Sequence, residues 1–174
     1  FLKSPYHNTN KNLINLFLTL QKSSKEKSLS PDNESVYNKL FSGRKYDYSR
    51  LRVLSSELLQ KAEQFLSVNK FLTDKAETKL YLLNELKNRK LDAHYRTNFR
   101  EAENYLSTSD KIDQSYFLNR YKLYNQYTDY LVSIDEEGNS TSIVLKSGEN
   151  LLAFFLTGFL NIAHELKIHE ETFN

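Results

Sequence analysis

Apolar residues recur at steps of three and four along almost the whole chain, and this spacing constrains the fold more than any other feature. Leu51, Leu54, Leu58 and Phe65, for example, fall on one face of a helix. The 174 residues include only 4 glycines and 2 prolines, which are too few for the many tight turns of a β-sandwich or barrel. The sequence therefore predicts an all-α protein.

The spacing predicts seven helices, with a polar loop at residues 21–33 and another at 135–142. The segment SIVL, residues 142–145, is either a short strand or an apolar anchor. We expect Ser30 to cap the second helix, with Pro31 at its first position, and Asp47 or Ser49 to cap the third. Asp74 with Glu77 should cap the fourth helix in the manner of a capping box, and Ser109 or Asp110 should cap the sixth. We expect the helices over residues 9–22, 31–41, 50–69, 74–89, 95–106, 110–131 and 148–167.

These helices are expected to form an N-terminal tri-helical unit, residues 1–72, and a helical array, residues 73–174, packed as one continuous body. In the first unit, a glycine turn, a cluster of arginines and a leucine-striped helix follow one another over residues 40–66, which is the order found in helix-turn-helix proteins. The second begins with two helices in residues 74–107, a length that matches one tetratricopeptide unit. The predicted architecture is therefore a tri-helical unit followed by stacked antiparallel hairpins, similar to a tetratricopeptide (TPR-like) solenoid.

Charge is divided unevenly between the two predicted parts. Residues 1–72 contain 12 Lys/Arg against 6 Asp/Glu, whereas residues 73–174 contain 12 against 16. A basic part joined to an acidic part suggests partners of opposite charge. The alternative is that the imbalance arises by chance on solvated helix faces.

The sequence contains none of the usual signatures of an enzyme or a metal site. It has no Cys, which excludes a disulfide scaffold and a thiolate zinc site. It also has no nucleophile elbow and no glycine-rich phosphate loop. His164 and His169 are five residues apart, so a helix turns them about 140° away from each other. We therefore predict no catalytic activity, no metal and no cofactor.

Residues 151–166, LLAFFLTGFLNIAHEL, are the most apolar stretch of the chain. They are shorter than the roughly 20 apolar residues that a membrane span needs, so we predict a buried core helix and no membrane span. No signal peptide is visible, and the absence of Cys fits a reducing compartment. The expected location is the cytoplasm. Because the chain begins at Phe1 and contains no Met, we expect it to be a fragment of a longer protein.

Four basic residues cluster near the start of the third predicted helix: Arg44, Lys45, Arg50 and Arg52. In a helix-turn-helix protein, early residues of the second helix reach bases while basic neighbours hold phosphates. These residues are therefore candidate nucleic-acid contacts. The alternative is that Arg50 and Arg52 lie on the solvated side of a packed helix, opposite the leucines.

Several tyrosines crowd the sixth predicted helix. Tyr116, Tyr121, Tyr124 and Tyr127 are a candidate aromatic face for a protein partner. A stacking platform for single-stranded nucleic acid would need a basic groove, and this part of the chain is acidic. The alternative is packing between helices, with the hydroxyls at the rim.

Two resemblances follow from particular segments. Residues 40–66, LFSGRKYDYSRLRVLSSELLQKAEQFL, resemble the DNA-binding effector domain of bacterial transcriptional activators, although residues 67–77 leave almost no room for a β-hairpin wing. The segments SPYHN, KLFSG, KLDAHY with EAENYL, and LLAFFLTGFLNIAHEL are similar to large uncharacterised α-helical proteins of Bacteroidota. That resemblance implies a bacterial, cytoplasmic helical-repeat protein and supplies no catalytic residues.

Two functions remain open from the sequence. The first is a non-enzymatic helical scaffold or interaction module that binds a protein partner of unknown identity. The second is a DNA-binding regulator that uses the helix-turn-helix-like N-terminal unit.

Overall fold

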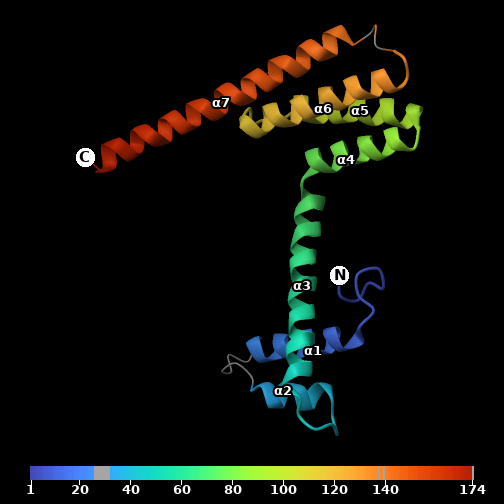
Figure 1. Ribbon diagram of the computed structural model, residues 1–174, viewed down its shortest axis with the longest axis vertical. Coiled ribbons are helices and arrows are strands. Elements are labelled where there is room, and N and C mark those ends of the chain that lie inside the picture. The colour runs from blue at the N-terminus through green and yellow to red at the C-terminus, as the bar shows by residue number, and fades with distance from the viewer. Residues whose placement is uncertain (26–31, 137, 139, 174) are drawn as a thin grey trace. The chain divides into compact units, whose positions relative to one another are not determined.

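The computed structural model describes residues 1–25, 32–136, 138 and 140–173 (Figure 1). Within these residues the chain forms seven α-helices and no β-strand, so the all-α prediction is confirmed. The helices divide into two compact units, Phe1–Lys70 and Phe71–Asn174, and each unit has its own apolar core.

The first unit contains α1 (Lys11–Lys25), α2 (Asn33–Leu40) and α3 (Tyr48–Thr73) up to Lys70. In each helix the apolar residues recur at helical spacing and so lie on one face. The three apolar faces together form one core. The core consists of Leu13, Leu16, Val36, Tyr37, Phe41, Leu51 and Leu54.

The turn between α2 and α3 depends on a glycine and an aspartate. The Arg44 N–H donates to the Phe41 carbonyl at 3.1 Å, and Gly43 has φ +81°, which suits the third position of a type II turn. The Arg50 N–H donates to Asp47 Oδ1 at 3.1 Å, so Asp47 rather than Ser49 caps α3. The predicted cap at Ser30 and Pro31 lies outside the described residues.

The second unit contains α4 (Lys75–Asn88), α5 (Asp92–Ser107), α6 (Gln114–Ser133) and α7 (Thr141–Phe173). Helices α4, α5 and α6 pack against one another, and α7 packs against α6. Their core is rich in leucine and tyrosine: Ala76, Leu80, Leu83, Tyr95, Phe99, Ala102, Leu106, Leu123, Tyr124, Tyr130 and Leu131.

Aspartates cap two helices of this unit. The Glu77 N–H donates to Asp74 Oδ1 at 3.1 Å, as the sequence predicts. The predicted cap of α6 is wrong, because the Tyr116 N–H donates to Asp113 Oδ1 at 2.9 Å. Helix α6 begins after Asp113, and the apolar Ile112, which suggested an earlier start, is exposed before it.

Helix α7 differs most from its prediction. It begins at Thr141 and therefore includes residues 142–145, which form neither a strand nor a separate anchor. Figure 1 shows α7 running back along α6 and continuing beyond the N-terminal end of α6. The prediction of a buried core helix is wrong, because α6 covers only one side of α7, and the described side chains that this contact buries are Ser147 and Asn150.

Candidate functional site

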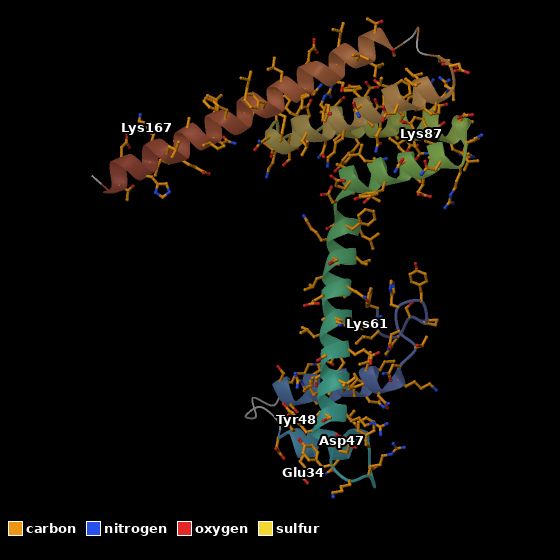
Figure 2. All side chains as sticks on the ribbon, in the orientation of Figure 1. Glu34, Asp47, Tyr48, Lys61, Lys87 and Lys167 are labelled. Atoms are coloured by element: carbon orange, nitrogen blue, oxygen red, sulfur yellow. The ribbon has the colours of Figure 1, made fainter. Side chains whose placement is uncertain are left out.

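The side of α7 that faces away from α6 is apolar and exposed. Its large apolar side chains have exposed fractions between 44% and 66%. Side chains project from α7 along its whole length (Figure 2). The large apolar ones on this side are Val144, Leu145, Leu151, Leu152, Phe155, Leu156, Phe159, Leu160, Ile162 and Leu166. A monomeric protein seldom leaves so continuous an apolar surface in water, so this surface is the principal candidate site.

Six of these residues form a narrower line, which we call the outer seam: Leu145, Leu152, Phe155, Phe159, Ile162 and Leu166. Leu145, Leu152, Phe159 and Leu166 follow one another at seven-residue steps, and so do Phe155 and Ile162. This is the a/d pattern with which one helix packs along another. Leu160 is exposed to a similar degree but lies about 100° around the helix from the seam.

The side of α7 that faces α6 combines polar and small residues with two half-buried apolar ones, Ile143 and Phe154. Ser147 and Asn150 are the buried polar residues here, and the Asn150 amide donates to the Lys146 carbonyl at 2.7 Å. Further along, the backbone of Gly158 lies so close to the side chain of Gln114 that a Cβ there would displace the Gln114 amide. Only the start of α7 contacts the core of the unit, through Ile143. Helix α7 therefore directs Ser147, Asn150 and two of its large apolar side chains toward α6, and it leaves most of its large apolar side chains exposed.

By length and composition alone, Thr141–His169 could cross a membrane. The sequence-based length argument considered only residues 151–166, and the helix extends well before and after them. The same composition is found in core helices of soluble proteins, but those are mostly buried, and α7 is not. The composition alone does not decide between a lipid and a protein surface.

The four basic candidate residues of the first unit, Arg44, Lys45, Arg50 and Arg52, are all exposed. The guanidinium of Arg50 lies over the ring of Phe41, with its Cζ 4.4 Å from the ring centroid. This cation–π contact holds Arg50 against the protein's own core residue.

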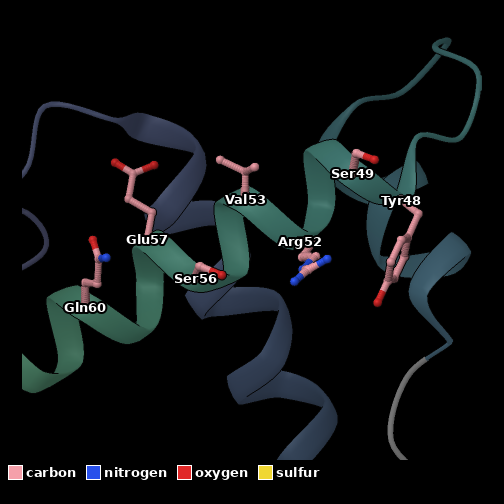
Figure 3. A pocket seen from close by; sticks show the side chains of 7 residues that line it. All are labelled: Tyr48, Ser49, Arg52, Val53, Ser56, Glu57 and Gln60. Atoms are coloured by element: carbon pink, nitrogen blue, oxygen red, sulfur yellow. The ribbon is translucent and has the colours of Figure 1, made fainter.

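Arg52 points to a different side of α3 from Arg50, because two residues turn a helix by about 200°. Figure 3 shows Arg52 in a shallow hollow of about 540 Å³ that also contains Tyr48 and Glu57. The carboxylate of Glu57 also accepts a hydrogen bond from the Asn10 amide at 3.1 Å. Arg50 and Arg52 therefore do not form a common basic face, and an acidic residue shares the hollow with Arg52.

Tyr124, one of the four candidate tyrosines, is 1% exposed and cannot contact a partner in this arrangement. Its hydroxyl donates to Glu103 Oε1 at 3.0 Å and accepts from Arg120 at 2.9 Å. Burial, and then the hydrogen bond to the Glu103 carboxylate, raise the pKa of Tyr124 to about 12. This phenol is a neutral structural group of the core.

The other candidate tyrosines divide between the core and its edge. Tyr127 stacks on Phe99 with ring centroids 3.9 Å apart. Tyr116 and Tyr121 are half-buried, and Tyr121 borders a separate hollow between α4 and α6. The structure thus gathers these tyrosines mainly by packing, and they do not make one exposed aromatic face.

The first unit has an apolar hollow of its own, of about 500 Å³, between α1, α3 and the N-terminal segment. Its surface is almost entirely apolar. The residues that line it are Phe1, Leu2, Phe17, Leu20, Ser55, Leu58, Leu59, Lys61, Ala62 and Phe65.

Among the described residues, no group of three or more His, Asp or Glu side chains could hold a metal ion. No protein-family model, no curated protein and no solved structure matches this chain. A function for this chain therefore has to be inferred from the arrangement of its own residues.

Proposed function

We propose that this chain is a non-enzymatic helical scaffold that docks on a helical surface of another protein through the outer seam of α7. The observation that supports the proposal is that Ser147 and Asn150 of α7 are buried, whereas Leu152, Phe155 and Phe159 of the same helix are exposed. Full burial of one Leu or Phe side chain stabilises a complex by about 1.5–3 kcal/mol. A line of such residues therefore favours a covered state.

A protein surface fits α7 better than a lipid bilayer. The stretch without charged residues between Glu149 and Glu165 is about 15 residues, or roughly 22 Å, whereas the hydrocarbon core of a bilayer is about 30 Å thick. A helix that lies in the membrane surface usually carries many Lys and Arg residues on its polar side. Helix α7 has Lys146 and Lys167 only, and these pair with Glu103 and Glu171.

The pairing of helices in the second unit supports a scaffold role. Helix α4 packs on α5 and α6 packs on α7, which supports the further proposal of stacked, TPR-like hairpins. The cytoplasmic location stays a prediction from the sequence. In arrays of stacked hairpins each hairpin covers its neighbour, so a helix without a neighbour on one side keeps that side open. The outer seam of α7 lies on such an open side.

The DNA-binding alternative is supported only by the exposure of Arg44, Lys45, Arg50 and Arg52. A salt titration with random duplex DNA tests it, because neutralised phosphates make affinity fall steeply with salt. We expect no salt-dependent binding. Steep binding that the triple variant Arg44→Ala/Arg50→Ala/Arg52→Ala abolishes would favour the alternative.

Cysteine labelling inside cells tests the scaffold proposal, because the chain has no Cys of its own. We compare Phe159→Cys on the outer seam with Lys167→Cys on the same helix, in the source organism, using a membrane-permeant maleimide. We expect Phe159→Cys to react at least tenfold more slowly while the protein stays in the soluble fraction.

Equal labelling of the two cysteines in cells would contradict the proposal. Protection that occurs only in the membrane fraction, and is lost on adding detergent, would instead indicate a lipid surface.

A further inference from the structure

We infer that the protein covering the outer seam is a second copy of this chain, whose α7 packs antiparallel to the first. The inference rests on the proposed function, since it names the partner of the same surface. It is based on the self-complementarity of the seam, the area that the seam offers and the part of α7 that extends beyond α6.

The seam is complementary to itself when two α7 helices run in opposite directions and cross near residue 157. The a/d pattern then places Leu152 of one copy against Ile162 of the other, and Phe155 against Phe159. Gly148 falls opposite Leu166. A Cβ built on Gly148 would have no packing neighbour from its own chain within 4 Å, so there is free space at this position. The small residue of the seam line therefore faces a large one, so that no layer of the pair lacks side-chain volume.

A parallel pair with equal register is less favourable. It places Gly148 against Gly148 and leaves a gap at that layer, because every residue meets its own copy. The antiparallel pair has no such gap. It also places Glu149 near Ala163 and Glu165 near Leu151, so that neither carboxylate lies beside a carboxylate of the other copy.

The exposed area of the seam is that of a stable interface. The six seam residues and their neighbours Leu151 and Leu156 are all between 44% and 64% exposed. At about 100 Å² for each large side chain, they offer roughly 800 Å² per copy. A standard stable protein interface buries about 800 Å² on each partner.

The part of α7 that extends beyond α6 supports the antiparallel direction. Gly158 lies at Gln114, the first residue of α6, so within the described part of the unit no helix neighbours the residues of α7 that follow Gly158 (Figure 1). In the antiparallel pair, this extension lies along residues 145–155 of the other copy. The partner therefore covers the segment that its own unit leaves uncovered.

Sedimentation equilibrium of the purified chain, over a wide concentration range, tests this inference. We expect a reversible dimer of twice 20.5 kDa. Leu152→Asn and Phe159→Asn should each weaken the dimer at least tenfold, and Leu160→Asn should change the dissociation constant less than twofold. Circular dichroism checks that the variants fold, which we expect because all three side chains are exposed.

A monomer at every concentration would overturn the inference, and so would equal effects of Leu152→Asn and Leu160→Asn. Flotation with phosphatidylcholine or phosphatidylserine vesicles, together with a monomeric protein in their absence, would assign the seam to lipid. If Phe159→Cys is protected in cells but the purified chain is monomeric, the dimer is wrong and the scaffold proposal stands. If Phe159→Cys is labelled freely in cells, the scaffold proposal itself fails.

Discussion

Tyr124 in α6 and Phe159 in α7 are both large aromatic residues on long helices of the same unit, yet the first is buried and the second is 61% exposed. Helix α6 packs its aromatic side chains against α4 and α5, and the hydroxyl of Tyr124 donates to Glu103. Helix α7 packs on α6 through Ser147, Asn150 and the half-buried Phe154, and it leaves most of its large apolar side chains exposed. The contrast shows that one part of the unit is complete on its own and that the other needs a further surface.

The largest expected effect tests whether the α4–α6 core is complete. Leu83 is 0% exposed, so Leu83→Ala should leave a cavity and lower the free energy of unfolding by about 3 kcal/mol. Leu160→Ala, at an exposed and off-seam position, should cost less than about 0.5 kcal/mol. Urea unfolding, with hydrogen exchange of α5 to locate the change, measures both. Equal costs would mean that α7 is packed as tightly as α4.

The next effect concerns alkaline pH. The pKa of Tyr124 is raised to about 12 from an ordinary value of 10.0, so the unfolded chain releases this proton at lower pH than the folded chain does. The stabilisation is complete below about pH 10 and is lost as the pH rises through about 12. It amounts to about 2 kcal/mol.

Tyr124→Phe removes this titration. Its free energy of unfolding should therefore fall less than that of the wild type between pH 10 and 12, which urea unfolding at each pH can measure. Parallel pH curves for the two proteins would show that Tyr124 is not held neutral by burial and Glu103.

The smallest effect tests how loosely α7 packs on α6. Gly148→Ala gains helix propensity with no neighbour to displace and should stabilise α7 by up to about 1 kcal/mol in dilute solution. Gly158→Ala must move the flexible end of Gln114, so its gain should be about 0.5 kcal/mol. Hydrogen exchange of α7 amides compares the two. A loss of stability in Gly158→Ala would mean that Gln114 is held in place and that the contact is tight.

Helical spacing was sufficient to predict the all-α class and most helices, because a helix needs only local information. The cap at Asp74 follows from the same local chemistry. The choice of Asp113 over Asp110 could not be predicted, since the apolar Ile112 lies between them and only the path of the chain decides whether Ile112 belongs to the helix. The position of Tyr124 in the core, beside Glu103, likewise depends on how α5 and α6 pack.

The candidate site shows the limit of sequence patterns in a different way. The seven-residue steps from Leu145 to Leu166 are present in the sequence, and so is the polar line that includes Ser147 and Asn150. A pattern identifies an apolar side but not what covers it. Only the packing of α6 on the polar side shows that the apolar side remains open.

The register of the two α7 helices tests the central claim most directly. Single-cysteine chains, Leu152→Cys and Ile162→Cys, are mixed and oxidised, and the crosslinked species are separated by mass. In the antiparallel pair these two positions face each other, whereas two copies of the same position lie roughly 15 Å apart along the axis. A disulfide needs Cα atoms within about 7 Å. We therefore predict crosslinks between Leu152→Cys and Ile162→Cys chains. Crosslinks only between identical chains, or none at all, would contradict the account.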